Sequence, residues 1–386
     1  MSGVGMAAAL LLTGCKGFWD ALPSTGTGTG AASGVFYVLN QKTLQVVGFS
    51  FPSGSTTPTA VTGGSSTLAA APLAITTNGT YLYVSTTVGI YMYTIGTGGT
   101  LTVGNSGTAI SADPAYSMVI DPTSQWLVEA VSGTGVLSAI PLDPTTGLNN
   151  SSFQVSTITL PNTNVQQVAI SPADSTNSYV FVAMGAGGTE VIPFNAANAT
   201  PFGTGANVPV KNSSGAANTV AVDTSGLLLY VGETAAITAT QTQPQTGGLR
   251  VFNIGATGLS GEISGSPYQT GGTGPSAILP SANGYYVYVA NKAVSGSSTG
   301  NITGFSITST AGVYSLTSIS TIGAGLSTQG LAEESTGTYV LAVNAGGTPD
   351  LSTYTFDTTT AGKLDAGATS ATGTDPVSAV AIAAVP

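Results

Sequence analysis

One pattern of hydrophobic and polar positions recurs along most of the chain. A short apolar segment is followed by a polar turn and then by a segment of aromatic and aliphatic residues, as in GTYLYVST and GYYVYVAN. Short runs rich in Val, Tyr and Ile between Gly- and Asn-containing turns predict β-strands joined as hairpins. Six complete copies of this strand pair begin at Leu73, Met118, Val168, Val220, Ala277 and Gly330.

A seventh copy is divided between the two ends of the sequence. GVFYVLN, from Gly34, matches only the second strand of the pair, and the missing first strand occurs in PVSAVAIAAVP, from Pro376. A split of this kind lets the first and last strands pair and close a ring. Equivalent positions lie 45 to 58 residues apart, near the roughly 40 to 50 residues of known propeller repeats. These positions are Phe36, Tyr81, Trp126, Tyr179, Leu228, Tyr286 and Tyr339.

The repeat length leaves room for two further strands. A third strand is visible in GIYMYTI from Gly89 and ITGFSI from Ile302. Four short antiparallel strands per repeat form a propeller blade. The alternatives are an open β-solenoid, which needs no split repeat, and two β-sandwiches, which predict no regular period. We therefore expect an all-β fold over residues 34–386: a seven-bladed β-propeller with four antiparallel strands per blade, closed by the C-terminal strand joining the N-terminal blade.

The N-terminus combines an apolar run with the single cysteine of the chain. Residues 6–12 (MAAALLL) are shorter than the roughly 20 residues of a transmembrane helix but fit a signal peptide. They lead into Leu12-Thr13-Gly14-Cys15, which resembles the lipobox of bacterial lipoproteins; a buried core thiol is the alternative. No Lys or Arg precedes the run, so the true start codon could lie elsewhere. We expect a signal peptide over residues 1–15, lipid attachment at Cys15 and a flexible tether over residues 16–33.

Composition narrows the chemistry. Only 6% of the residues are charged, the net charge is −10, and the six cations are scattered, so a nucleic-acid partner is not expected. The chain has no histidine, which removes Ser-His-Asp triads and the commonest metal ligand. We therefore expect neither a metal nor another cofactor.

Several second strands carry a family resemblance. GVFYVLN, GTYLYVST, GYYVYVAN and GTYVLAVN are similar to the YVTN strands of bacterial lactonase-like propellers, a family that includes propeller-type 6-phosphogluconolactonases. The resemblance covers residues 34–386 and implies the seven-bladed scaffold. It also implies a catalytic set of His with Arg and Glu, from which this chain departs because it has no histidine.

Candidate chemistry is expected on one face of the propeller. Loops that follow second strands share a face with the connections between blades, where propeller ligands commonly bind. Glu129 or Glu233 could act as a base, and Arg250 or Lys292 could stabilise an oxyanion. The candidate ligand-binding residues on this face are Asn40, Lys42, Asn291 and Asn344.

Two functions stay open at this stage. The first is an exported binding or scaffold propeller, anchored by a lipid in the bacterial cell envelope, either in the periplasm or at the cell surface. Its partners would be the membrane and an unknown small molecule, carbohydrate or protein on one propeller face. The alternative is a hydrolase of a sugar lactone, resembling the 6-phosphogluconolactonases. The missing histidine favours the first function.

Overall fold

The computed structural model describes residues 33–172, 178–346, 349–367 and 375–386. The chain divides into two compact units, Met1–Ala31 and Ala32–Pro386, and every described residue belongs to the second. The expected signal peptide, Cys15 and nearly all of the expected tether lie outside the described residues. Within the described part, no helix is long and apolar enough to cross a membrane.

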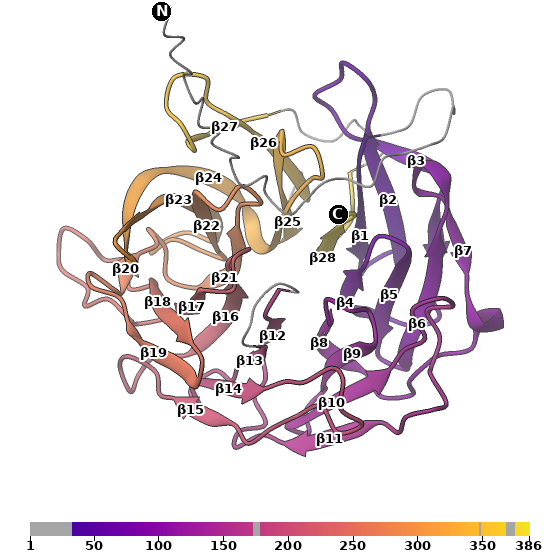
Figure 1. The fold of residues 1–386 in the computed structure, drawn as a ribbon. Helices are drawn as coiled ribbons and strands as arrows, with labels where there is room; N and C mark the ends of the chain where they lie inside the picture. The colour runs from indigo at the N-terminus through magenta and orange to yellow at the C-terminus, as the bar shows by residue number, and fades with distance from the viewer. Residues whose placement is uncertain (1–32, 173–177, 347–348, 368–374) are drawn as a thin grey trace, which may run out of the picture. The chain divides into compact units, whose positions relative to one another are not determined.

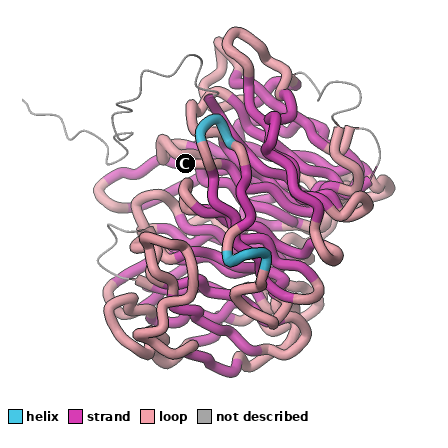
Figure 2. The backbone as a smooth tube through the Cα atoms, turned by 90° about the vertical axis from the view of Figure 1, so that its right-hand side faces the viewer, coloured by secondary structure: helices cyan, strands magenta, loops and turns pink. Residues whose placement is uncertain are grey.

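Antiparallel sheets make up the second unit, and each blade is built from four main strands (Figure 1). Blades 1 to 3 contain β28 (Ala379–Ala384), β1 (Ser33–Asn40), β2 (Gln45–Phe51) and β3 (Thr59–Thr67); β4 (Pro72–Thr77), β5 (Tyr81–Thr86), β6 (Gly89–Ile95) and β7 (Leu101–Val103); and β8 (Ala115–Ile120), β9 (Trp126–Val131), β10 (Val136–Pro141) and β11 (Ser156–Thr159). Blades 4 and 5 contain β12 (Gln167–Ile170), β13 (Tyr179–Ala183), β14 (Thr189–Pro193) and β15 (Ala206–Val208); and β16 (Ala217–Val222), β17 (Leu228–Glu233), β18 (Gly248–Gly255) and β19 (Gly258–Glu262), with the short β20 (Tyr268–Gln269) beside β18. Blades 6 and 7 contain β21 (Pro275–Pro280), β22 (Tyr286–Asn291), β23 (Thr299–Thr310), β24 (Val313–Glu333), β25 (Tyr339–Gly346), β26 (Leu351–Phe356) and β27 (Leu364–Ala366). Helix in the described residues is limited to two 3₁₀ turns, η1 (Thr97–Gly99) and η2 (Asn105–Gly107) (Figure 2).

One strand serves two blades. β24 is 21 residues long; its first part pairs with β23 and its last part pairs with β25. It is therefore the outer strand of blade 6 and the inner strand of blade 7. The two blades form one continuous seven-stranded sheet for this reason.

The ring closes through the C-terminal strand, as the sequence predicts. β28 pairs antiparallel with β1, from Phe36 opposite Ala384 to Asn40 opposite Ala379. Contacts between innermost strands then run around the ring in the order β4, β8, β12, β16, β21, β24, β28 and back to β4. The all-β, seven-bladed prediction is confirmed.

Each pair of adjacent blades encloses one apolar cluster, and the seven clusters together form the core. The second strand of a blade is packed on both faces, so β5, β9 and β17 are buried along their whole length. This explains why these strands read as continuous apolar runs rather than as alternating ones. The turns before them are capped by side chains: Asp121 accepts from the backbone N–H of Trp126, and Asp223 from that of Leu228 at 2.7 Å.

Buried tyrosines link neighbouring blades. The hydroxyl groups of Tyr37, Tyr83 and Tyr288 donate to the carbonyl oxygens of Gly99, Gly147 and Gly362 at 2.9, 2.8 and 2.8 Å, each glycine lying in the next blade. Gly147 and Gly362 have φ values of 70° and 76°, and a Cβ atom at either would lie within 2.6 Å of an aromatic ring. Glycine is needed there for both reasons.

The same bonds correct one predicted equivalence. Tyr37 takes the place of Tyr83 and Tyr288, so Val35 rather than Phe36 is equivalent to Tyr81 and Tyr286. The prediction was wrong by one residue. The first copy consists of the second strand alone, without the polar turn that precedes this strand in the other six copies. There is therefore no turn in the sequence from which to align its residues with theirs.

We predict that Tyr288→Phe lowers the free energy of unfolding by about 1–2 kcal/mol, because it leaves the buried Gly362 carbonyl without its donor. Tyr230→Phe is the matched control: Tyr230 is fully buried at the equivalent position of blade 5, and its hydroxyl makes no hydrogen bond within the described residues. Urea unfolding of both variants checks this. Equal losses of stability would contradict the role given to the tyrosine–glycine bond.

Candidate functional site

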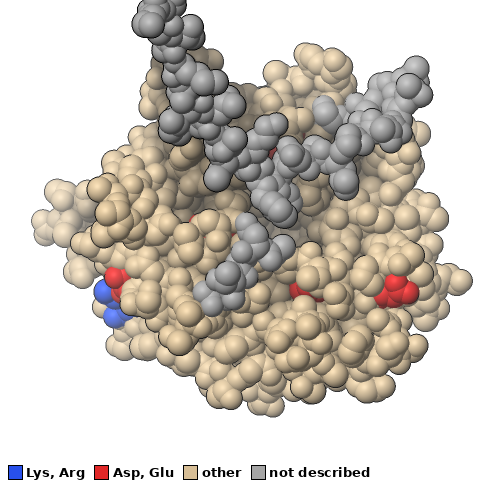
Figure 3. Space-filling view, in the orientation of Figure 1, with Lys and Arg blue, Asp and Glu red and all other residues tan. Residues whose placement is uncertain are grey.

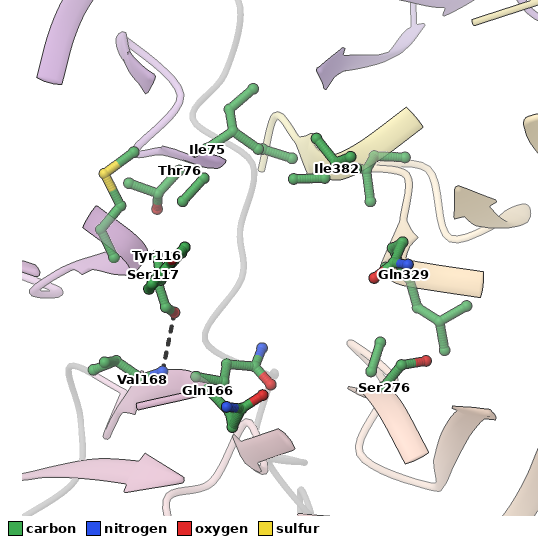
Figure 4. A pocket seen from close by; sticks show the side chains of 18 of the residues that line it. Ile75, Thr76, Tyr116, Ser117, Gln166, Val168, Ser276, Gln329 and Ile382 are labelled. Carbon is green, nitrogen blue, oxygen red and sulfur yellow. Dashed lines mark hydrogen bonds between the residues drawn. The ribbon is translucent and has the colours of Figure 1, made fainter. Parts of the chain in front are cut away.

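A cavity of about 560 Å³ lies on the ring axis and is lined by residues from all seven innermost strands. Ligand pockets commonly measure about 300–1,000 Å³, so the volume suits a small molecule. Figure 4 shows labelled side chains from several blades around this cavity. The shape of the ring, rather than any single sequence motif, brings these residues together.

Aliphatic side chains gather on one side of the cavity and amide side chains on the other. The division is not complete, because β4 also contributes Thr76 and Thr77, and the amide side also contributes Val168, Ile278 and Leu331. Apolar side chains come from β4 and β28, including Ile75 and Ile382, which lie close together in Figure 4. Amide and hydroxyl side chains come from blades 4 to 7, and Gln166 and Ser276 lie across the cavity from the two isoleucines. We call the first group the apolar wall: Leu73, Ile75, Val380 and Ile382. We call the second group the polar wall: Gln166, Gln167, Asn218, Ser276 and Gln329.

Hydrogen bonds between neighbouring inner strands fix part of this lining. Ser117 accepts from the backbone N–H of Val168 at 3.0 Å, and the side-chain oxygen of Gln167 accepts from Val220 N–H at 3.1 Å. Among the described residues only the oxygen of Gln167 is bonded in this way, so its NH₂ group could donate to a ligand. Tyr116 also lines the cavity and is 52% exposed, so its ring offers an aromatic surface.

Charge is scarce at the cavity. Among the described residues that line it, Lys292 is the one Lys, Arg, Asp or Glu. Its backbone N–H donates to the Gly274 carbonyl at 2.8 Å, its side chain is exposed, and none of the ion pairs found among the described residues includes it. Figure 3 shows how few charged side chains reach the visible face of the molecule.

Glu233 and Arg250 come together, but away from this lining. Arg250 donates to Glu233 at 2.8 Å and to Glu262 at 3.1 and 3.2 Å, and it also donates to the carbonyl oxygen of Pro209 at 2.8 Å. Burial alone would lower the pKa of Arg250, yet these bonds to Glu262 and Glu233 raise it. Glu233 also accepts from the backbone N–H of Lys211 at 2.8 Å. The two side chains thus hold the connection between blades 4 and 5.

Glu129 lies in blade 3 and is 1% exposed. Burial, together with the nearby Asp113 carboxylate, raises the pKa of Glu129 to about 8, although a hydrogen bond with Ser111 opposes the shift. Its Oε2 atom has no hydrogen-bond partner in the described residues. At neutral pH the group is therefore mostly a neutral carboxylic acid.

The four expected ligand-binding residues divide into two kinds. Asn291 is fully buried, exchanges hydrogen bonds with Thr270 and donates to Asn301 at 2.8 Å. Asn344 is fully buried and accepts from Thr328 at 2.9 Å. Asn40 is buried at the end of β1 beside β28, whereas Lys42 is exposed in the turn that follows. None of the three asparagines lines the cavity, and Lys292 is the one sequence candidate that does.

The residues of the polar wall were not among the candidates from the sequence. They lie in or next to innermost strands, whereas those candidates lie at or near the ends of second strands. A usable signal was present: Gln166, Gln167, Asn218 and Gln329 are amide residues within or beside otherwise apolar strands. The described residues include no group of three His, Cys, Asp or Glu side chains that could hold a metal ion.

Comparison with known proteins gives a consistent result. A family model described as "Lactonase, 7-bladed beta-propeller" matches residues 36–381. A search of curated proteins finds no match. A protein from Bacteroides fragilis, provisionally named a 6-phosphogluconolactonase, is similar with a TM-score of 0.67 at 15% identity, over 92% of this chain and 99% of that one. A periplasmic gluconolactonase from Pseudomonas aeruginosa is similar with a TM-score of 0.64 at 14% identity, over 91% of this chain and 99% of that one. At these identities the solved structures show a shared fold.

We predict that Glu129→Gln reduces the loss of stability between pH 5 and pH 8. The pKa of Glu129 is raised from 4.5 to about 8 in the folded protein, so stability is fully present below about 4.5 and is lost as pH rises through 8. Glutamine stays neutral and removes this dependence. Unfolding by urea at both pH values checks the prediction, and the same pH dependence in both proteins would contradict it.

Proposed function

Because the chain belongs to the lactonase family of seven-bladed β-propellers, we propose that it binds a small, hydroxyl-rich molecule of carbohydrate type in its central cavity, without catalysing a reaction on it. The observation that carries this proposal is the pairing of a polar wall with an apolar wall in a cavity of about 560 Å³. A sugar or polyol presents hydroxyl groups on its edges and C–H bonds on its faces. Amide side chains can form hydrogen bonds with the hydroxyl groups, and Ile75, Ile382 and Tyr116 can pack against the C–H faces.

The distribution of charge supports binding without catalysis. Opening a lactone needs a base or an activated water and a donor for the developing oxyanion. The described lining supplies one lysine and no carboxylate. The carboxylate of Glu233 and the guanidinium of Arg250 are already engaged with each other at 2.8 Å.

Hydrolysis of a sugar lactone is the second candidate function. The family description and the similarity to a periplasmic gluconolactonase of Pseudomonas aeruginosa favour it. Glu129 would be the residue to test, because a carboxyl group with a pKa of about 8 can act as a general acid at neutral pH. Its burial at a distance from the ion-paired Arg250, in another blade, weighs against a joint role for the two.

The N-terminal segment bears on where the protein is located. Leu12-Thr13-Gly14-Cys15 resembles a lipobox, so we propose that the protein is exported and anchored by a lipid at Cys15 in the bacterial cell envelope. The tether over residues 16–33 would then separate the propeller from the membrane. A propeller placed in this way could bind a solute, a carbohydrate or a protein at the envelope.

We predict that the full chain, purified in detergent, hydrolyses no member of a panel of aldonolactones above the spontaneous rate, because the described lining of its cavity supplies no carboxylate or histidine base. Spontaneous opening is followed in parallel without protein and with the Glu129→Gln variant. Enzymatic turnover that disappears in Glu129→Gln would favour the hydrolase instead. Turnover that persists in the variant would also contradict the binding function.

We predict that cells fed radioactive palmitate incorporate label into the wild-type chain and not into Cys15→Ala, because acylation requires the cysteine thiol. Membrane fractionation should show the same difference. Label retained by Cys15→Ala would exclude Cys15 as the attachment site.

A further inference from the structure

We infer that the cavity selects the open-chain, singly charged form of a hydroxy acid over its neutral lactone or a neutral polyol, with Lys292 as the residue that distinguishes them. This inference rests on the proposed binding function and adds the chemical class of the ligand. It starts from the position of Lys292, which lines the cavity and directly follows Asn291, the last residue of β22. Asn291 pairs with Pro275, the first residue of β21, so Lys292 lies beside the start of the strand that carries Ser276.

Lys292 is available to a ligand. The other cations for which ion pairs are found are already matched: Lys211 with Glu262, Arg250 with Glu233, and Lys363 with Asp357 and Asp365. Lys292 takes part in none of these pairs, and the described residues that line the cavity with it carry no opposite charge. Lys292 is therefore the one cation of the described lining with which an entering carboxylate could pair.

The number of charges favours a carboxylate over a phosphate. A phosphate carries close to two negative charges near neutral pH and is usually held by several donors, with arginine offering two at once. The described lining contains one lysine and no arginine, and the chain has a net charge of −10. One ammonium group matches one carboxylate, whereas a second negative charge would have no partner.

The remainder of the lining suits an extended polyhydroxy chain. The polar wall offers amide and hydroxyl groups on the side that includes β21, from which Ser276 comes. Gln167 retains its NH₂ group because its oxygen already accepts from Thr219 and Val220. Hydroxyl groups can bond there while the carbon chain lies against Ile75 and Ile382.

Binding of three probes to the full chain in detergent tests this inference: D-gluconate and D-sorbitol at equilibrium, and D-glucono-1,5-lactone by rapid mixing, before it opens to gluconate. Gluconate and sorbitol have the same chain length and differ in charge. Because Lys292 is exposed, we expect gluconate to bind roughly fivefold more tightly than sorbitol at low ionic strength. The advantage should shrink in about 0.5 M salt, where charges are screened over a few ångströms.

Three variants make the result specific. Lys292→Gln should abolish the preference for gluconate, whereas Lys292→Arg should retain it. Lys42→Gln is the matched control, since it removes another exposed lysine that does not line the cavity. The loss of preference should occur without loss of sorbitol binding, which also shows that the variant is folded. A D-sorbitol 6-phosphate arm separates the two anions, and it should bind no better than gluconate.

Several outcomes would overturn the inference. Equal binding of gluconate and sorbitol to the wild type, tighter binding of the lactone or of the phosphate, or a preference that survives in Lys292→Gln would each do so while leaving a binding function intact. Absence of binding by all the probes would instead contradict the proposed function and this inference together.

Discussion

Contact between neighbouring blades depends on buried apolar side chains, because the chain has few charged residues and so few ion pairs to join them. Charged residues make up 6% of the sequence, and its single cysteine precedes the described residues. Each interface is an apolar cluster, and at four of them a tyrosine hydroxyl donates to a glycine carbonyl of the next blade. The hydrogen bond fixes the tyrosine hydroxyl, and the absence of a Cβ atom at Gly147 and Gly362 leaves room for the rings of Tyr81 and Tyr286. β28 then pairs with β1 to complete the ring that these contacts build.

Most of the charged side chains discussed above lie between or within the blades rather than on the ring axis. Arg250 and Glu233 are buried against each other and hold the connection between blades 4 and 5, and Glu129 is buried in blade 3 as a mostly neutral acid. Charged groups that brace the interfaces are not free to line the ring axis. The central cavity is consequently walled by amides, hydroxyls and aliphatic side chains, with Lys292 as the charged member of its described lining. A site of this kind is better suited to holding a polar molecule than to breaking a bond in it.

Much of the fold could be predicted from the sequence, because each blade repeats a local hairpin and because the split repeat at Gly34 and Pro376 specifies closure. The turns that Asp121 and Asp223 cap are equally local features. The site was harder to predict. Arg250 meets Glu233 through the pairing of β17 with β18, and Gln166 and Ser276 line one cavity only because the seven blades close into a ring. Such neighbours depend on register and curvature, which a single sequence does not state; the one-residue error at Phe36 had the same origin.

The central claim is that the ring axis is the place where a ligand binds. Hydrogen–deuterium exchange of the full chain, with and without saturating D-gluconate, measures this most directly. We expect slower exchange in peptides from the innermost strands that line the cavity, above all around Gln166, Ser276 and Gln329, with little change in the outer strands β7, β11 and β15. Protection confined to the outer strands or to the turns between them would contradict it.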